Sequence, residues 1–147
     1  MSTPSPIRVL VVAHKTAATP ALIAAVRERA GRGPAQFTLL VPNPTSGLNR
    51  MSDEEGRGAS DAEQVLALAL PLLSEAAHAP VEGLVGDANP LDAVQDAVNV
   101  QGFDEIIIST LPHRVSRWLH LDLPSKLNGL GLPITTVTAA ESDGAAG

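Results

Sequence analysis

The sequence IRVLVVA, from Ile7 to Ala13, is an apolar run that only Arg8 interrupts. A strand with one face in water alternates apolar and polar residues, whereas a strand buried on both faces is apolar almost throughout. The run therefore predicts a strand in the middle of a covered sheet. Four further segments have the composition of strands: Phe37–Val41, Val81–Val85, Glu105–Ser109 and Ile134–Val137.

Segments with helical periodicity lie between these strands. The spacing of apolar residues predicts a helix from Pro20 to Arg29, a second that starts at Ser60 and a third that starts at Asn89. Ser60 and Glu63 form a predicted capping box, and Asn89 is the predicted N-cap of a helix with Pro90 at its first position. Strands that alternate with such helices form βαβ units. We therefore predict an α/β fold: one doubly wound, Rossmann-like domain with a five-stranded, mainly parallel sheet and flanking helices.

Length and composition restrict the class of protein. A chain of 147 residues fits a single domain (residues 1–147), in which residues 43–60 form a predicted exposed loop insertion and residues 139–147 a predicted flexible tail. The absence of cysteine excludes a disulfide framework and a thiolate zinc site. The sequence has neither a signal-peptide pattern nor an apolar run long enough to span a bilayer, so we expect a cytoplasmic protein without a membrane partner.

Charge and aromatic content argue against nucleic acid as a partner. The formal net charge is -6, whereas phosphate neutralisation needs clustered cations. Phe37, Phe103 and Trp118 are the only aromatic residues, which is too few for a base-stacking platform.

Polar and cationic residues gather where three predicted strands end. In an open α/β sheet, ligands bind beyond the carboxyl ends of the strands. The first and fourth strands of a doubly wound sheet are neighbours, so Lys15 could face Arg114 and Arg117 and hold an anion with them. The candidate ligand-binding residues are His14, Lys15, Thr16, Asp87, Ser109, Thr110, His113, Arg114 and Arg117.

Each candidate also has a structural interpretation, and both interpretations stay open. The cations are also consistent with solvated surface charges. Thr110 is the expected N-cap of the turn that follows it, while Ser109 either offers its hydroxyl to a ligand or only satisfies the strand end. Arg117 is also placed for a cation–π contact with Trp118.

Motifs for catalysis and for metal binding are missing from the sequence. There is no G-x-S-x-G elbow, Walker lysine or G-x-G-x-x-G loop. His14 and His113 could converge, but no H-x3-H pair or HExxH helix accompanies them. We therefore nominate no catalytic residue and no metal site.

The chain resembles the universal stress protein family, a group of adenine-nucleotide-binding Rossmann-like domains. The segment Val85-Gly86-Asp87, followed by Pro90, is similar to the Gly-Asp-Pro turn of that family, with two additional residues. The closing segment, residues 132–137 (LPITTV), is similar to the proline-led last strand, which often pairs between subunits. The resemblance implies the fold, a homodimer through the C-terminal strand, and ATP or AMP with Mg²⁺ as candidate ligands.

The nucleotide-binding motif of that family keeps its spacing here but not its chemistry. Gly-x2-Gly-x9-Gly-(Ser/Thr) falls on Ser109, Pro112, Asp122 and Leu123. Glycines at these positions would bring backbone N–H groups close to phosphates. Pro112 has no N–H to donate, and the carboxylate of Asp122 would repel an anion.

We therefore expect a non-catalytic, regulatory binding protein with a diverged pocket for an anionic or nucleotide-like small molecule. Three alternatives remain. A genuine ATP- or AMP-binding stress protein would use Lys15, Arg114 and Arg117 in place of the glycines. A nucleotide hydrolase would need an acid–base residue, and a purely structural dimer would have an empty pocket.

Overall fold

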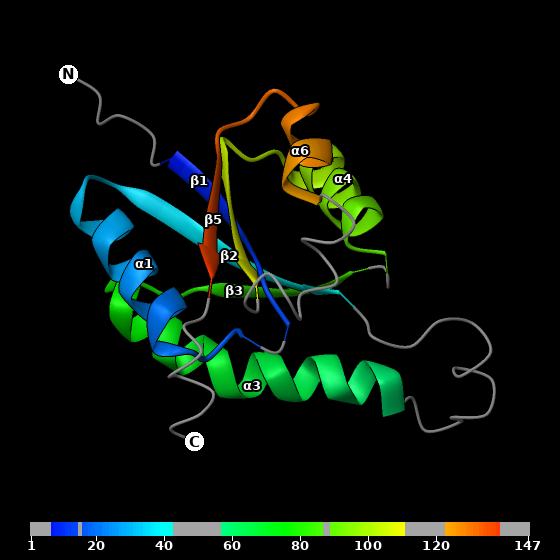
Figure 1. The fold of residues 1–147 in the computed structure, drawn as a ribbon. Coiled ribbons are helices and arrows are strands. Elements are labelled where there is room, and N and C mark those ends of the chain that lie inside the picture. The colour runs from blue at the N-terminus through cyan, green and yellow to red at the C-terminus, as the bar shows by residue number, and fades with distance from the viewer. Residues whose placement is uncertain (1–6, 15, 43–56, 87–88, 111–122, 139–147) are drawn as a thin grey trace.

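The computed structural model describes residues 7–14, 16–42, 57–86, 89–110 and 123–138. They form one sheet of five parallel strands in the order β3-β2-β1-β4-β5, which confirms the predicted doubly wound α/β fold (Figure 1). The strands are β1 (Ile7–Val12), β2 (Ala35–Pro42), β3 (Glu82–Gly86), β4 (Glu105–Thr110) and β5 (Ile134–Thr138). The described helices are α1 (Pro20–Gly31), α3 (Arg57–Ala77), α4 (Pro90–Gln101) and α6 (Leu123–Asn128).

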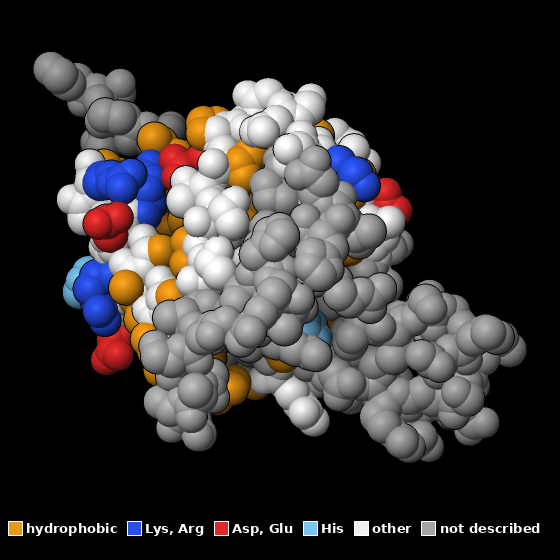
Figure 2. Space-filling view, viewed as in Figure 1, with side chains coloured by type: hydrophobic (Ala, Val, Ile, Leu, Met, Phe, Trp, Pro, Cys, Tyr) orange, Lys and Arg blue, Asp and Glu red, His pale blue; other side chains and the backbone are white. Residues whose placement is uncertain are grey.

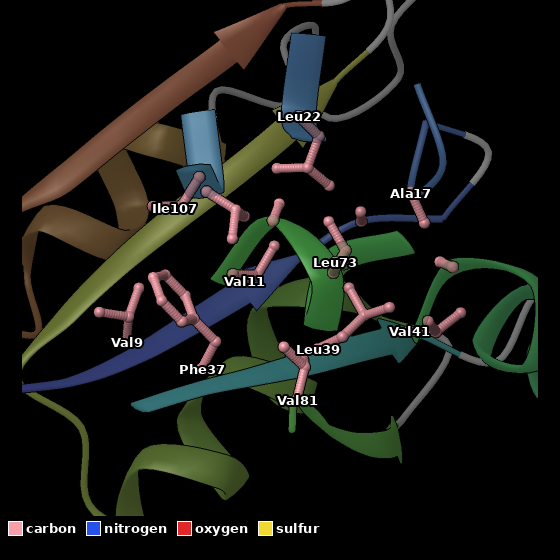
Figure 3. Packing of buried hydrophobic residues seen from close by; sticks show 14 of the residues in the cluster. Val9, Val11, Ala17, Leu22, Phe37, Leu39, Val41, Leu73, Val81 and Ile107 are labelled. Atoms are coloured by element: carbon pink, nitrogen blue, oxygen red, sulfur yellow. The ribbon is translucent and has the colours of Figure 1, made fainter. Parts of the chain in front are cut away.

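Helices cover both faces of the sheet, and β1 contributes to the core on each side. Val11 of β1 belongs to the same apolar cluster as Leu22 of α1 and Leu73 of α3 (Figure 3). Its neighbour Leu10 points to the opposite face and joins the cluster that contains Val94 of α4. All five side chains are fully buried. The double burial predicted for the first strand is therefore confirmed.

The strand order creates a switch point between β1 and β4. The chain leaves β1 toward β2 on one side, and it returns to the other side of β1 as β4. Val12, the last residue of β1, pairs with Ile108 of β4. Because parallel strands in this register end together, the residues that follow Val12 and Ile108 lie at one edge of the sheet.

Helix starts agree with the sequence at α4 but not at α3. Asn89 caps α4 as predicted, since its side chain accepts hydrogen bonds from the backbone N–H groups of Leu91 and Asp92. In contrast, α3 begins at Arg57, so residues 57–60 are helical rather than part of the loop, and Ser60 is not the N-cap. Once packing has nucleated a helix, each added residue gains a hydrogen bond, and this extends the helix across an unfavourable segment. Residues 43–56 and 139–147 lie outside the described residues.

The described helices do not include a membrane-spanning segment. Even α3, with 21 residues, is not apolar enough along its length to cross a bilayer.

Two ion pairs of α1 differ sharply in their surroundings. Arg29 Nε lies 3.0 Å from Oε2 of Glu105 at the start of β4, and these side chains are only 10% and 19% exposed. Arg32 pairs with Glu28 at 3.2 Å, with side chains that are 66% and 73% exposed. Figure 2 shows both positive and negative side chains on the side of the molecule where α1 lies. The Arg29–Glu105 pair thus joins α1 to the sheet, whereas the other pair is a surface contact.

We predict that Arg29→Met lowers the free energy of unfolding by roughly 2 kcal/mol, because it leaves the carboxylate of Glu105 half-buried without its partner. The matched change Arg32→Met should cost less than about 0.5 kcal/mol, as expected for an exposed pair. Urea unfolding followed by circular dichroism measures both values. Equal losses for the two variants would contradict a structural role for the Arg29–Glu105 pair.

Candidate functional site

Two buried hydroxyl groups meet at the edge of the sheet where β1 and β4 end. Oγ1 of Thr16, in the turn after β1, lies 2.6 Å from Oγ of Ser109, the fifth residue of β4. The two residues are 93 positions apart in sequence, and each is only 2% exposed. A hydroxyl that accepts a hydrogen bond still keeps its own proton. The pair therefore ties the turn to β4 and retains one further donor.

The turn between β1 and α1 positions Thr16 through its own hydrogen bonds. The N–H of Ala17 donates to the carbonyl of His14, and the N–H of Thr19 donates to the carbonyl of Thr16. The hydroxyl of Thr19 also donates to that carbonyl, at 2.8 Å, instead of capping α1. Pro20 then starts the helix, where its missing N–H costs nothing. The compact turn brings the Thr16 side chain to the end of β4.

A third hydroxyl lies on the opposite face of β4. Ile107 packs in the cluster of α1 and α3, and Ile108 packs in the cluster of α4 and α6. Because side chains alternate along a strand, Ser109 faces the α1 layer and Thr110 faces the α4 and α6 layer. Thr110 is 2% exposed, and its Oγ1 has no hydrogen-bond partner within the described part of the chain.

An unpartnered buried hydroxyl is unusual and costly. Most buried polar groups are paired, and leaving one unpaired costs about 1–3 kcal/mol. The cost falls when a bound molecule supplies the partner. Thr110 therefore marks the end of β4 as a position where a ligand atom would be favoured.

Four of the nine predicted site residues can be located. Thr16 and Ser109 are brought into contact, and Thr110 follows on the same strand. His14 is half-buried directly after β1, with its Nε2 removed from solvent. The other five predicted site residues lie outside the described part of the chain: Lys15, Asp87, His113, Arg114 and Arg117. The turn that Thr110 is predicted to cap also lies outside it.

The sequence identified the members of the hydroxyl pair but not their contact. Thr16 follows the first predicted strand, and Ser109 ends the fourth. The only signal for their contact is that both residues carry a hydroxyl at the ends of strands that become neighbours.

The described residues do not contain a cluster of metal-ligating side chains. Magnesium prefers carboxylate and other oxygen ligands in octahedral geometry. Within the described ranges there is no group of three or more His, Cys, Asp or Glu residues that could hold a metal ion. The hydroxyls of Thr16, Ser109 and Thr110 do not form such a carboxylate set, so we assign them no part in metal binding.

The topology and the buried hydroxyls define a class: a doubly wound parallel α/β protein with buried hydroxyl groups at its switch point. No protein-family model and no curated protein matches the sequence. Solved structures do match, and universal stress proteins are among them. The protein has the fold of the universal stress proteins, which confirms the structural resemblance seen in the sequence.

The three similar structures agree along nearly their whole length. One is from Arabidopsis thaliana with AMP bound, with a TM-score of 0.63, 13% identity and coverage of 92% of this chain and 93% of that one. Another, from Archaeoglobus fulgidus in complex with dAMP, has a TM-score of 0.60, 20% identity and coverage of 90% and 98%. A third, in complex with cAMP, has a TM-score of 0.62, 13% identity and coverage of 93% and 100%.

Proposed function

We propose that this protein is a non-catalytic regulatory binding protein that holds an adenine nucleotide, or a similar anionic small molecule, at the carboxyl ends of β1 and β4. The observation that carries the proposal is the buried hydroxyl of Thr110, which has no hydrogen-bond partner among the described residues and directly follows Ser109 along β4. Ligands of doubly wound folds bind at this switch point. Three universal stress proteins of this fold are complexed with AMP, dAMP or cAMP.

The chemistry of the hydroxyls suits a nucleotide. A buried hydroxyl donates to an oxygen or nitrogen acceptor, and nucleotides present such acceptors on phosphate, sugar and base. Neutral hydroxyls do not balance the charge of a phosphate, so the proposal includes cations from the neighbouring turns. These are Lys15, His113, Arg114 and Arg117, proposed from the sequence alone, and His14 and Asp87 complete the proposed set.

The proposed function has two versions, which differ in the ligand that the protein prefers. A genuine ATP or AMP binder would discriminate nucleotides from inorganic phosphate, whereas a diverged pocket would accept other anions equally well. A nucleotide hydrolase is disfavoured because no acid–base residue is nominated, and chromatography of the recovered nucleotide tests this point. The proposed location is the cytoplasm.

Thr110→Val should stabilise the free protein by about 1 kcal/mol, because a methyl group replaces a buried hydroxyl that has no partner among the described residues. The same change should weaken AMP binding about five- to tenfold, because one ligand hydrogen bond is lost. Urea unfolding and isothermal titration calorimetry measure the two effects. The control Thr135→Val, at an exposed position of β5, should change neither.

The double variant Lys15→Ala/Arg114→Ala tests the proposed cations. It should lose AMP and phosphate binding while its unfolding free energy stays within about 0.5 kcal/mol of the wild type. Unchanged AMP affinity in this variant would show that Lys15 and Arg114 do not contribute to AMP binding. A folded wild-type protein that binds neither AMP, ATP nor phosphate would contradict the binding function itself.

We also propose a homodimer that forms through β5. Among the described strands, β5 lies at one edge of the sheet, so the backbone groups on its outer side have no neighbouring strand there. The carbonyl of Pro133 accepts from Ile106 in β4, so alternation along the strand turns the N–H of Thr136 away from β4. Pairing with a second copy would satisfy such edge groups and give a closed two-fold assembly.

Thr136→Pro should convert the dimer to a monomer, because proline removes an outward N–H without removing a hydrogen bond to β4. Thr136→Val keeps that N–H and should remain dimeric. Multi-angle light scattering at micromolar protein concentration distinguishes the two states. A monomeric wild-type protein would rule out this interface.

A further inference from the structure

The middle of α3 is apolar on its outer side as well as on its inner side. Its buried side comprises Ala62, Ala69, Leu73 and Ala76, all fully removed from solvent. On the opposite side, two successive turns of the helix carry exposed apolar residues: Ala67, Leu68, Pro71 and Leu72. We call these four residues the α3 strip. In Figure 1, α3 forms the outermost described element along the bottom of the molecule.

The α3 strip is not explained by the packing of the fold. Leu68 is 65% exposed and Leu72 is 38% exposed, so both leave apolar surface in water. They are four residues apart, which places them side by side on the helix surface. Scattered exposed leucines need no explanation, whereas a contiguous apolar patch is typical of a binding surface.

Pro71 adds a polar feature to the strip. A residue inside a helix normally donates its N–H to the carbonyl four positions earlier, and proline has no N–H. The carbonyl of Ala67 therefore lacks its usual helical donor. This carbonyl belongs to an exposed residue of the strip, where a donor from another molecule can reach it.

Charges at the ends of the strip favour a basic partner. Glu75 continues the strip by one turn, Glu63 lies at its edge near the other end, and both are exposed. They are twelve positions apart, which corresponds to about 18 Å along the helix. An antiparallel contact between two copies of α3 would bring Glu63 of one copy toward Glu75 of the other, which is repulsive. The net charge of -6 also steers cationic partners toward the protein.

We propose that the α3 strip binds a basic amphipathic helix of another protein. Apolar side chains of that helix would pack against Leu68 and Leu72, as neighbouring helices do when their ridges and grooves meet. Lysine or arginine residues about 18 Å apart would approach Glu63 and Glu75. This interaction is independent of the nucleotide site at the carboxyl ends of β1 and β4.

A designed peptide tests the proposal. The probe is an 18-residue fluorescein-labelled helix with leucine along one face and lysine on both flanks, and its matched control has glutamate in place of lysine. Fluorescence anisotropy with the full chain should show binding of the lysine peptide that weakens as salt rises. Leu68→Gln should reduce its affinity at least tenfold. The control Val100→Gln, at an 81% exposed position of α4, should change it less than twofold.

Several outcomes would overturn the proposal. These are no binding of the lysine peptide, equal binding of the glutamate peptide, or unchanged affinity in Leu68→Gln. Self-association that Leu68→Gln abolishes but Thr136→Pro does not would show that a second copy covers the strip instead. If Leu68→Gln fails to fold, as judged by circular dichroism, Glu75→Lys replaces it and should lower the affinity of the lysine peptide.

Discussion

β1 lies in the middle of the sheet, and its residues from Val9 to Val12 are completely removed from solvent. Both of its faces must be covered for this burial, and helices on both sides provide the cover. Burying such side chains stabilises a fold by about 1.5–3 kcal/mol each. Because crossovers between parallel strands are right-handed, helices reach both faces only when the chain continues to both sides of β1. This puts β2 and β4 on opposite sides of β1 and creates the switch point where polar groups can face a ligand. The position of the candidate site thus follows from the burial of one strand.

At that switch point, the apolar interior gives way to hydroxyl groups within one or two residues. The hydroxyls of Thr16 and Ser109 form a hydrogen bond with each other, whereas the hydroxyl of Thr110 has no hydrogen-bond partner among the described residues. An arrangement that is less stable without a ligand is typical of binding sites, where local stability is exchanged for recognition. The α3 strip is a second place where side chains do not stabilise the fold, since its exposed leucines do not contribute to the core.

The sequence predicted what depends on local pattern. The apolar run of β1 indicated burial on both faces, and Asn89 with Pro90 indicated the start of α4, because short-range chemistry determines both features. The start of α3 at Arg57 was not predicted, since packing beyond the local segment extends the helix. The Thr16–Ser109 contact could not be predicted from the sequence either, because it depends on the register of two strands that are far apart in the chain.

A nucleotide at the proposed site would lie against the buried hydroxyls at the ends of β1 and β4. Methyl-labelled threonine NMR during titration with AMP tests this placement, with spectra of Thr16→Val and Thr110→Val assigning the two signals. These two signals should shift, while that of Thr38, elsewhere in the sheet, stays in place. AMP binding that leaves both signals unmoved would show that the nucleotide binds elsewhere in the protein.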